Sequence, residues 1–193
     1  MERIVESPVQ LDWVAGLMRG APIKESSKTL GEMQGLFRDD GATGDEATRV
    51  LYTVQRWETV PAGTEGALAW GVTRIEPGRV GEEFFMTHGH FHANPSRGEY
   101  YGAVQGEGLL LLMDRSRRTW AERMSTGSLH AIDGRHAHRV INTGGSPLIF
   151  WACWPSDAGY DYEAIVRDGF GARVIAKNGS TILEFENGDA TAV

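Results

Sequence analysis

Cysteine, excess positive charge and long hydrophobic runs are all scarce in this sequence of 193 residues. Cys153 is the only cysteine, so no disulfide can form within the chain, and a reducing compartment such as the cytoplasm is expected. The longest apolar runs fall far short of the roughly 18 residues of a membrane helix, and the charged N-terminus does not resemble an export signal. The formal net charge of −7 argues against nucleic acid as a partner.

Short apolar or alternating runs separated by turn residues dominate the sequence from about residue 50 onward. These runs cover residues 50–55, 68–75, 83–92, 99–105, 109–114, 119–124, 128–133, 138–142, 148–154, 173–176 and 181–185. The 25 glycines supply the positive φ angles that tight turns need. Many short strands at this spacing predict an all-β sandwich or closed barrel. Since no linker or repeat divides the chain, we expect one domain over 1–193, with an arm at 1–48, a barrel at 49–185 and a tail at 186–193.

One short helix is expected near the C-terminus, and the N-terminal segment is expected to be irregular. Asp161 can cap a helix over 162–167, and Gly169 can end it. Residues 8–39 are predicted to form an irregular arm on the barrel, with helical turns around 11–18 and 32–37.

Two histidines in one expected strand begin a candidate metal site. His90 and His92 are two residues apart, so their imidazoles share one face, with Cα atoms about 6.6 Å apart. Glu99 follows after a turn that allows a neighbouring strand to return its carboxylate beside them, and His138 on a later strand offers a third imidazole. Three neutral nitrogens and one carboxylate suit Fe²⁺, Mn²⁺, Zn²⁺ or Ni²⁺.

A second ligand geometry stays open on the sequence alone. His88 shares the expected strand, and a pair made of His88 and His90 is possible if Gly89 bends the chain. Three successive histidines on one straight strand cannot all reach one ion, because they extend over about 13 Å. His130 and His136 are expected to be ordinary hydrogen-bonded histidines.

These residues match the two sequence motifs of the cupins. The first motif is represented by His90, His92, Glu99 and Gly106, and the second by Gly127, His138 and Asn142. The resemblance implies a cupin double-stranded β-helix, a jelly-roll barrel. Asp133 and Arg135 stand where proline and glycine are frequent in the second motif, and the glycine before the first histidine is displaced, but no ligand is lost.

Within the cupins, the sequence is similar to the cupin-type phosphoglucose isomerases over roughly residues 5–185. The similarity rests on residues 29–37, 77–92, 97–101, 138–142 and 154–162. It implies a homodimer that interconverts glucose 6-phosphate and fructose 6-phosphate and binds one divalent metal ion per subunit, Fe²⁺ first among the candidates. The metal ligands would be the four residues chosen above from their spacing.

The same resemblance assigns substrate contacts. Phosphate contacts would fall on Thr73, Thr87 and the backbone of Gly89, with His88 replacing a lysine of some members. The sugar would meet Tyr101, Trp154, Tyr160 and Tyr162. Trp154 replaces a usual tyrosine and Tyr160 a frequent histidine. Taken alone, the two threonines fit an ordinary strand, and Tyr101 and Tyr162 fit packing equally well.

Glu99 and Tyr162 are the expected catalytic residues. Glu99 is the carboxylate that the spacing places within reach of C1 and C2, as the base of a proton-transfer route, although a direct hydride shift is equally open. Two other functions compete with the isomerase: a cupin dioxygenase using the same ligand set, and a non-catalytic sugar-binding cupin. The sequence does not decide whether mannose 6-phosphate is also a substrate.

Overall fold

The computed structural model describes residues 4–20, 22–39 and 44–193. Every strand pair among them is antiparallel, and the fold is all-β, as predicted. The strands are β1 (Val9–Asp12), β2 (Leu17–Gly20), β3 (Lys24–Thr29), β4 (Val50–Glu58), β5 (Leu68–Ile75), β6 (Arg79–Val80), β7 (Glu83–Phe84), β8 (Glu99–Gln105), β9 (Glu107–Met113), β10 (Thr119–Ser125), β11 (Leu129–Ile132), β12 (Ala137–Asn142), β13 (Leu148–Pro155), β14 (Ala172–Lys177), β15 (Ser180–Phe185) and β16 (Ala190–Ala192).

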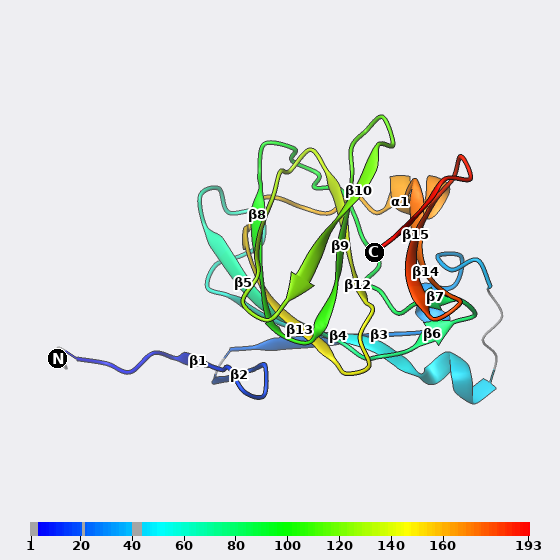
Figure 1. Ribbon diagram of the computed structural model, residues 1–193. Helices are drawn as coiled ribbons and strands as arrows, with labels where there is room; N and C mark the ends of the chain where they lie inside the picture. Colours follow the sequence, from blue (N-terminus) through cyan, green and yellow to red (C-terminus); the bar gives the residue numbers. More distant parts are fainter. Residues whose placement is uncertain (1–3, 21, 40–43) are drawn as a thin grey trace.

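Two sheets face each other to form a barrel. A six-stranded sheet has the order β11-β8-β13-β5-β4-β3, and a three-stranded sheet has the order β10-β9-β12. Figure 1 shows these sheets curving around a common interior, with β14 and β15 at one side. Residues 109–113 of β9 are all buried, because the apolar run of this strand packs on both of its faces.

The run at 83–92, expected as one strand, forms only the two-residue β7. Beyond it, the chain meets β12 through single bridges, Met86 with Ile141 and His90 with His138. Gly89 has φ +76°, a left-handed conformation that a regular strand does not allow. The prediction of a continuous strand is therefore wrong, and the bend that glycine makes possible is present.

The N-terminal segment contains strands where a helical turn was expected. The turn predicted around 11–18 is wrong, because β1 and β2 form a hairpin there. The side chain of Asp12 accepts hydrogen bonds from the N–H groups of Val14 (3.1 Å) and Ala15 (2.9 Å), which fold the chain into the hairpin turn. β3 then pairs with β4 as the edge of the six-stranded sheet, so this part of the expected arm belongs to the barrel wall.

Helical structure is limited to three short pieces among the described residues: η1 (Gly31–Met33), η2 (Gly44–Thr48) and α1 (Glu163–Asp168). Gly31–Met33 overlaps the second helical turn expected at 32–37. Gly169 ends α1 with φ +66°, as predicted, but the cap is Tyr162 and makes no side-chain hydrogen bond. Asp161 instead pairs with Arg115, so its expected capping role is wrong. None of the described helices is long and apolar enough to cross a membrane.

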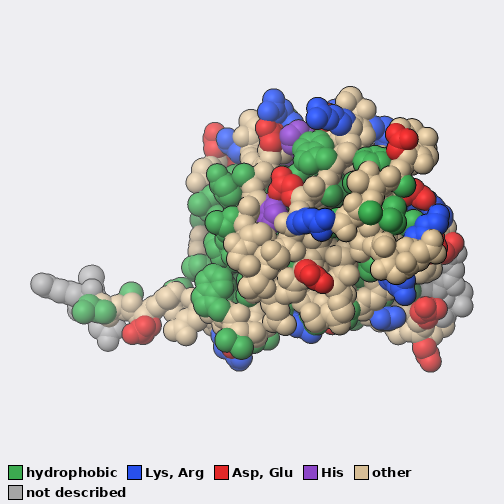
Figure 2. All heavy atoms as spheres, in the orientation of Figure 1, with side chains coloured by type: hydrophobic (Ala, Val, Ile, Leu, Met, Phe, Trp, Pro, Cys, Tyr) green, Lys and Arg blue, Asp and Glu red, His purple; other side chains and the backbone are tan. Residues whose placement is uncertain are grey.

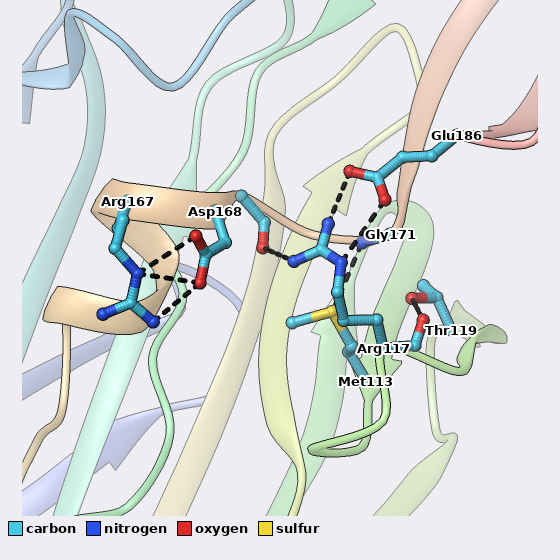
Figure 3. Close-up of polar contacts among 8 residues, drawn as sticks. Met113, Arg117, Thr119, Arg167, Asp168, Gly171 and Glu186 are labelled. Carbon is cyan, nitrogen blue, oxygen red and sulfur yellow. Dashed lines mark hydrogen bonds and ion pairs between the residues drawn. The ribbon is translucent and has the colours of Figure 1, made fainter.

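Arg117 fastens the C-terminal strands to the barrel. Figure 3 shows its guanidinium between the carboxylate of Glu186 (2.5 Å) and the carbonyl oxygen of Gly169 (3.4 Å). Nearby, the N–H of Gly171 meets the sulfur of Met113 at 3.2 Å. The final residues, expected as a tail, contain β16, which pairs with β15.

Candidate metal and substrate site

One cavity inside the barrel collects the candidate functional residues. Its volume is about 200 Å³. The lining residues are Ser26, Lys28, Tyr52, Val54, Arg56, Thr73, Thr87, His88, Gly89, His90, His92, Glu99, Tyr101, His138, Phe150, Ala152, Trp154, Tyr160 and Tyr162. Every site residue proposed from the sequence is among them.

Four side chains converge at one end of this cavity, and we call them the metal quartet: His90, His92, Glu99 and His138. One ligand atom from each lies within 4.8 Å of the others. They come from three elements: the bent segment after β7, the start of β8, and β12. The distances from Glu99 Oε1 are 2.6 Å to His138 Nε2 and 3.3 Å to His92 Nε2.

The quartet fits a divalent metal ion. His138 Nε2 is buried without a hydrogen-bond partner, although Glu99 Oε1 is only 2.6 Å away, because the angles there are not those of a hydrogen bond. A buried nitrogen that forms no hydrogen bond is free to bind a metal ion. Three imidazoles and one carboxylate also form a donor set that transition metals accept.

Hydrogen bonds and burial prepare the imidazoles as ligands. His92 Nδ1 donates to the carbonyl oxygen of Arg97 at 2.5 Å, which leaves Nε2 without a proton for a metal. Burial, together with the neighbouring His138, lowers the pKa of His90 well below its ordinary value, so this ring is neutral at pH 7. Neutral imidazole is the form that binds metals.

Glu99 is held in its charged form. Burial alone would raise its pKa, but the neighbouring His138 and His92 side chains outweigh burial and hold the pKa well below its usual range. Tyr101 is buried beside it, and burial and the negative charge of Glu99 raise the pKa of that phenol well above its ordinary value. Its hydroxyl is therefore a hydrogen-bond donor to the carboxylate.

His88 lies outside the quartet. Its Nδ1 is 2.9 Å from the carbonyl oxygen of Gly89, and its ring meets Tyr162 edge-on at 4.9 Å. The bend at Gly89 turns His88 away from the ion position, so the geometry favours the pair His90 and His92. His130 bonds Glu122 and Ser128 and His136 packs on Trp120, as expected of structural histidines.

Hydrogen-bond donors also line the cavity. Thr87 Oγ1 accepts the N–H of Val140 at 3.1 Å, so its own hydroxyl proton remains free to donate. Thr73 of β5 and the backbone of Gly89 also line the cavity. Such a set of hydroxyl and N–H donors suits an anion.

Two tyrosines cover the quartet. The rings of Tyr160 and Tyr162 stack at 5.8 Å, and their centroids lie 4.9 and 5.5 Å from that of His90. Trp154 packs on Gly71, where an added Cβ would lie 3.1 Å from the indole. The tryptophan that replaces the usual tyrosine therefore fills space against the sheet instead of offering a phenol.

Strand register explains how β4 contributes residues that sequence reasoning missed. Tyr52, Val54 and Arg56 are every second residue of β4, and their side chains face inward. Across the neighbouring strands, Arg56 pairs with Gly71, Gly71 with Ala152, and Ala152 with Tyr101, so Arg56 lies in the same row as Tyr101. Their period of two was visible in the sequence. Ser26 and Lys28 of β3 gave no such signal, because their polar strand resembled an arm.

Arg56 stands out among these missed residues. Its Nε is buried with no hydrogen-bond partner, and none of the ion pairs found among the described residues includes it. Burial raises the pKa of Tyr160, and the charge of Arg56 beside the phenol lowers it in part. An arginine without a carboxylate partner among the described residues thus lines the cavity.

Known proteins resemble this chain over almost its whole length. The model of the family described as glucose-6-phosphate isomerase matches residues 27–191. The glucose-6-phosphate isomerase of Thermococcus litoralis is 36% identical over 91% of this chain and 92% of its own, and that of Pyrococcus furiosus is 37% identical over 89% and 90%. Structures of Bacillus subtilis oxalate decarboxylase match 56% of this chain and 27% of theirs, with 19% identity and a TM-score of 0.45, which is no indication of a shared activity.

Proposed function

The chain belongs to the glucose-6-phosphate isomerase family, and we propose that it isomerises its sugar phosphate in the barrel cavity on a metal ion held by the metal quartet. It is an enzyme that interconverts glucose 6-phosphate and fructose 6-phosphate. The observation that supports the location is that the quartet and the cluster of anion donors share one cavity. No feature of the site favours the dioxygenase or the sugar-binding alternative.

The donor end of the cavity is the proposed phosphate subsite. Thr73, Thr87 and the Gly89 N–H would bind the phosphate oxygens, as the resemblance implies, and Lys28 would add positive charge. Burial raises the pKa of Tyr52 to about 12, so its hydroxyl stays protonated and can also donate. Binding the phosphate here fixes C1 and C2 near the quartet, which reduces the entropy cost of reaching the transition state.

The proposed resident metal is Fe²⁺, with Mn²⁺, Zn²⁺ and Ni²⁺ as the alternatives that this donor set also accepts. When bound, a divalent ion supplies Lewis acidity that polarises the sugar carbonyl. The second-sphere contacts at His92 and Tyr101 would hold the ligands in place.

Proton movement is assigned to Glu99 and Tyr162. From glucose 6-phosphate, the carboxylate takes the proton of C2, the C1–C2 bond gains double-bond character, and the same proton returns to C1 as the carbonyl forms at C2. Burial raises the pKa of Tyr162, so this hydroxyl stays protonated and can exchange a proton with the sugar oxygens. Tyr160, Trp154 and Tyr101 would enclose the sugar, and Arg56 would donate to a sugar oxygen.

We also place the enzyme in the cytoplasm as a homodimer. The single free cysteine is consistent with a reducing compartment. On the outer face of the six-stranded sheet, Leu68, Tyr100 and Leu129 are exposed, and Figure 2 shows apolar side chains gathered on that side of the barrel, next to the projecting N-terminal segment. An exposed apolar face of this kind is typical of a subunit interface. Light scattering coupled to gel filtration tests the dimer.

One experiment tests the function directly. The purified protein is stripped of metal, reloaded with each divalent ion in turn, and assayed for conversion of fructose 6-phosphate. We expect activity to be absent without metal and restored by at least one ion. Absence of activity under every condition would overturn the proposal.

A further inference from the structure

Arg139 is a buried cation directly behind the proposed phosphate subsite. It follows the ligand His138 on β12, and its residue surface is 6% exposed. Nε and Nη2 donate to the carbonyl oxygen of His88 at 3.2 and 2.5 Å, and the guanidinium lies 4.7 Å from the centre of the Phe170 ring. Arg139 does not line the cavity itself, so any effect on a ligand passes through the His88–Gly89 peptide.

No carboxylate neutralises this guanidinium within the described part of the chain. Glu83 is the acid whose charge acts on it, but Glu83 Oε1 accepts Arg173 at 2.7 Å, and Oε2 accepts the backbone N–H of Arg38. A guanidinium keeps its positive charge at pH 7 even when it is buried. A buried charge without a partner is costly unless another group offsets it.

Arg139 sets the orientation of the peptide bond between His88 and Gly89. In a trans peptide, the carbonyl of one residue and the N–H of the next point in opposite directions. Arg139 holds the His88 carbonyl on the outer side, so the Gly89 N–H faces the cavity, where no acceptor for it is found among the described residues. A Cβ at Gly89 would lie 2.8 Å from Phe170 Cε2 and 3.1 Å from Arg139 Cβ, so the close packing of Arg139 also requires glycine here.

We propose that Arg139 is the positioning residue of the phosphate subsite: it holds the His88 carbonyl so that the Gly89 N–H faces the substrate, and its unpaired charge favours a dianion there. This inference rests on the proposed function. The phosphate group of the substrate is the ligand whose charge offsets the buried guanidinium. Lysine can replace the charge but only one of the two hydrogen bonds.

The test uses the Arg139→Met and Arg139→Lys variants, with Arg115→Met as a matched control. Arg115 also lies over a phenylalanine, Phe91, at 3.8 Å, but makes no contact with the 88–89 peptide. Titration calorimetry with inorganic phosphate measures the subsite without catalysis, and KM and kcat for fructose 6-phosphate are measured beside it. We expect Arg139→Met to weaken phosphate binding and raise KM by about 10- to 100-fold with kcat within about threefold, Arg139→Lys to lie between, and the control to match the wild type.

The results that would overturn the role of Arg139 differ from those that would overturn the proposed function. Unchanged phosphate affinity in a folded Arg139→Met or Arg139→Lys protein overturns the positioning role even if the wild type is an active isomerase. A fall in kcat, metal content and melting temperature with KM unchanged indicates a merely structural role and also overturns it. If Arg139→Met does not fold, the Arg139→Lys result decides. Loss of isomerase activity in the wild type itself is the separate failure of the proposed function.

Discussion

Replacing Glu99 by glutamine separates its two proposed roles, metal ligand and base. The side chain is 5% exposed, and its Oε1 lies 2.6 Å from His138 Nε2. Glutamine therefore fits the same space and keeps one oxygen toward the proposed ion position. The substitution removes the negative charge and the capacity to accept a proton from carbon. Because a general base typically contributes about 10²- to 10⁴-fold, we expect kcat to fall by that factor even when metal is saturating.

The assay is a titration of isomerase activity against metal in Glu99→Gln, with the exposed carboxylate of Glu107 replaced in the control Glu107→Gln. A loss of one anionic ligand also weakens metal affinity, so the midpoint of the titration should move to higher metal concentration. The activity at saturating metal, the plateau of the titration, measures the effect of the substitution on kcat. A plateau near the wild-type kcat would refute Glu99 as the base and favour a hydride shift between C2 and C1.

Three further outcomes follow from the same site. Removing the metal with a chelator should abolish turnover but leave the circular dichroism spectrum of the folded barrel unchanged. The barrel is stabilised by burial of apolar side chains, about 2 kcal/mol of folding free energy for each fully buried leucine, and this burial does not depend on the ion. Loss of the folded spectrum on chelation would contradict the prediction. Elemental analysis should find no bound metal in His90→Ala, His92→Ala or His138→Ala. His88→Ala should keep its metal and show a raised KM. Loss of metal in His88→Ala would instead support His88 and His90 as the ligand pair. Arg56→Gln should lower kcat/KM for fructose 6-phosphate by about 10-fold or more without affecting metal content, because it removes a charged donor to the sugar. An unchanged kcat/KM would exclude a contact between Arg56 and the sugar.

The strand pattern and the ligand spacing were predictable from the sequence because both depend on short-range geometry. Alternation with period two marked the inward faces, and two histidines separated by one residue share a face whether or not the strand is long. Glu99 and His138 followed because a turn and a later strand bring them back to the same interior. The helical turn expected around 11–18 was wrong because the Asp12 carboxylate accepts hydrogen bonds from the N–H groups of Val14 and Ala15, a local preference that competes with helix formation.

Residues of β3 and β4 were missed because their part in the cavity depends on which strands become neighbours. Nothing in the sequence near Lys28 shows that its strand adds to the edge beside β4. Arg139 was also missed, since a charged residue next to a ligand histidine appears surface-exposed until the fold encloses it. Pairing and burial of this kind are properties of the whole chain, and a local pattern does not contain them.

The bent segment 87–92 contains residues of both the proposed phosphate subsite and the proposed metal site. In the proposed site, Thr87 and Gly89 would bind the phosphate, and His90 and His92 would bind the ion. The separation between the phosphate and the reacting carbons would then be set by a few peptide bonds. β12 fixes this segment at two points: the Thr87 N–H donates to Val140 at 2.9 Å, and the His138 N–H donates to His90 at 3.1 Å. A regular strand would have sent these side chains alternately to opposite faces. The positive φ at Gly89 breaks that alternation, so residues on both sides of it line one cavity.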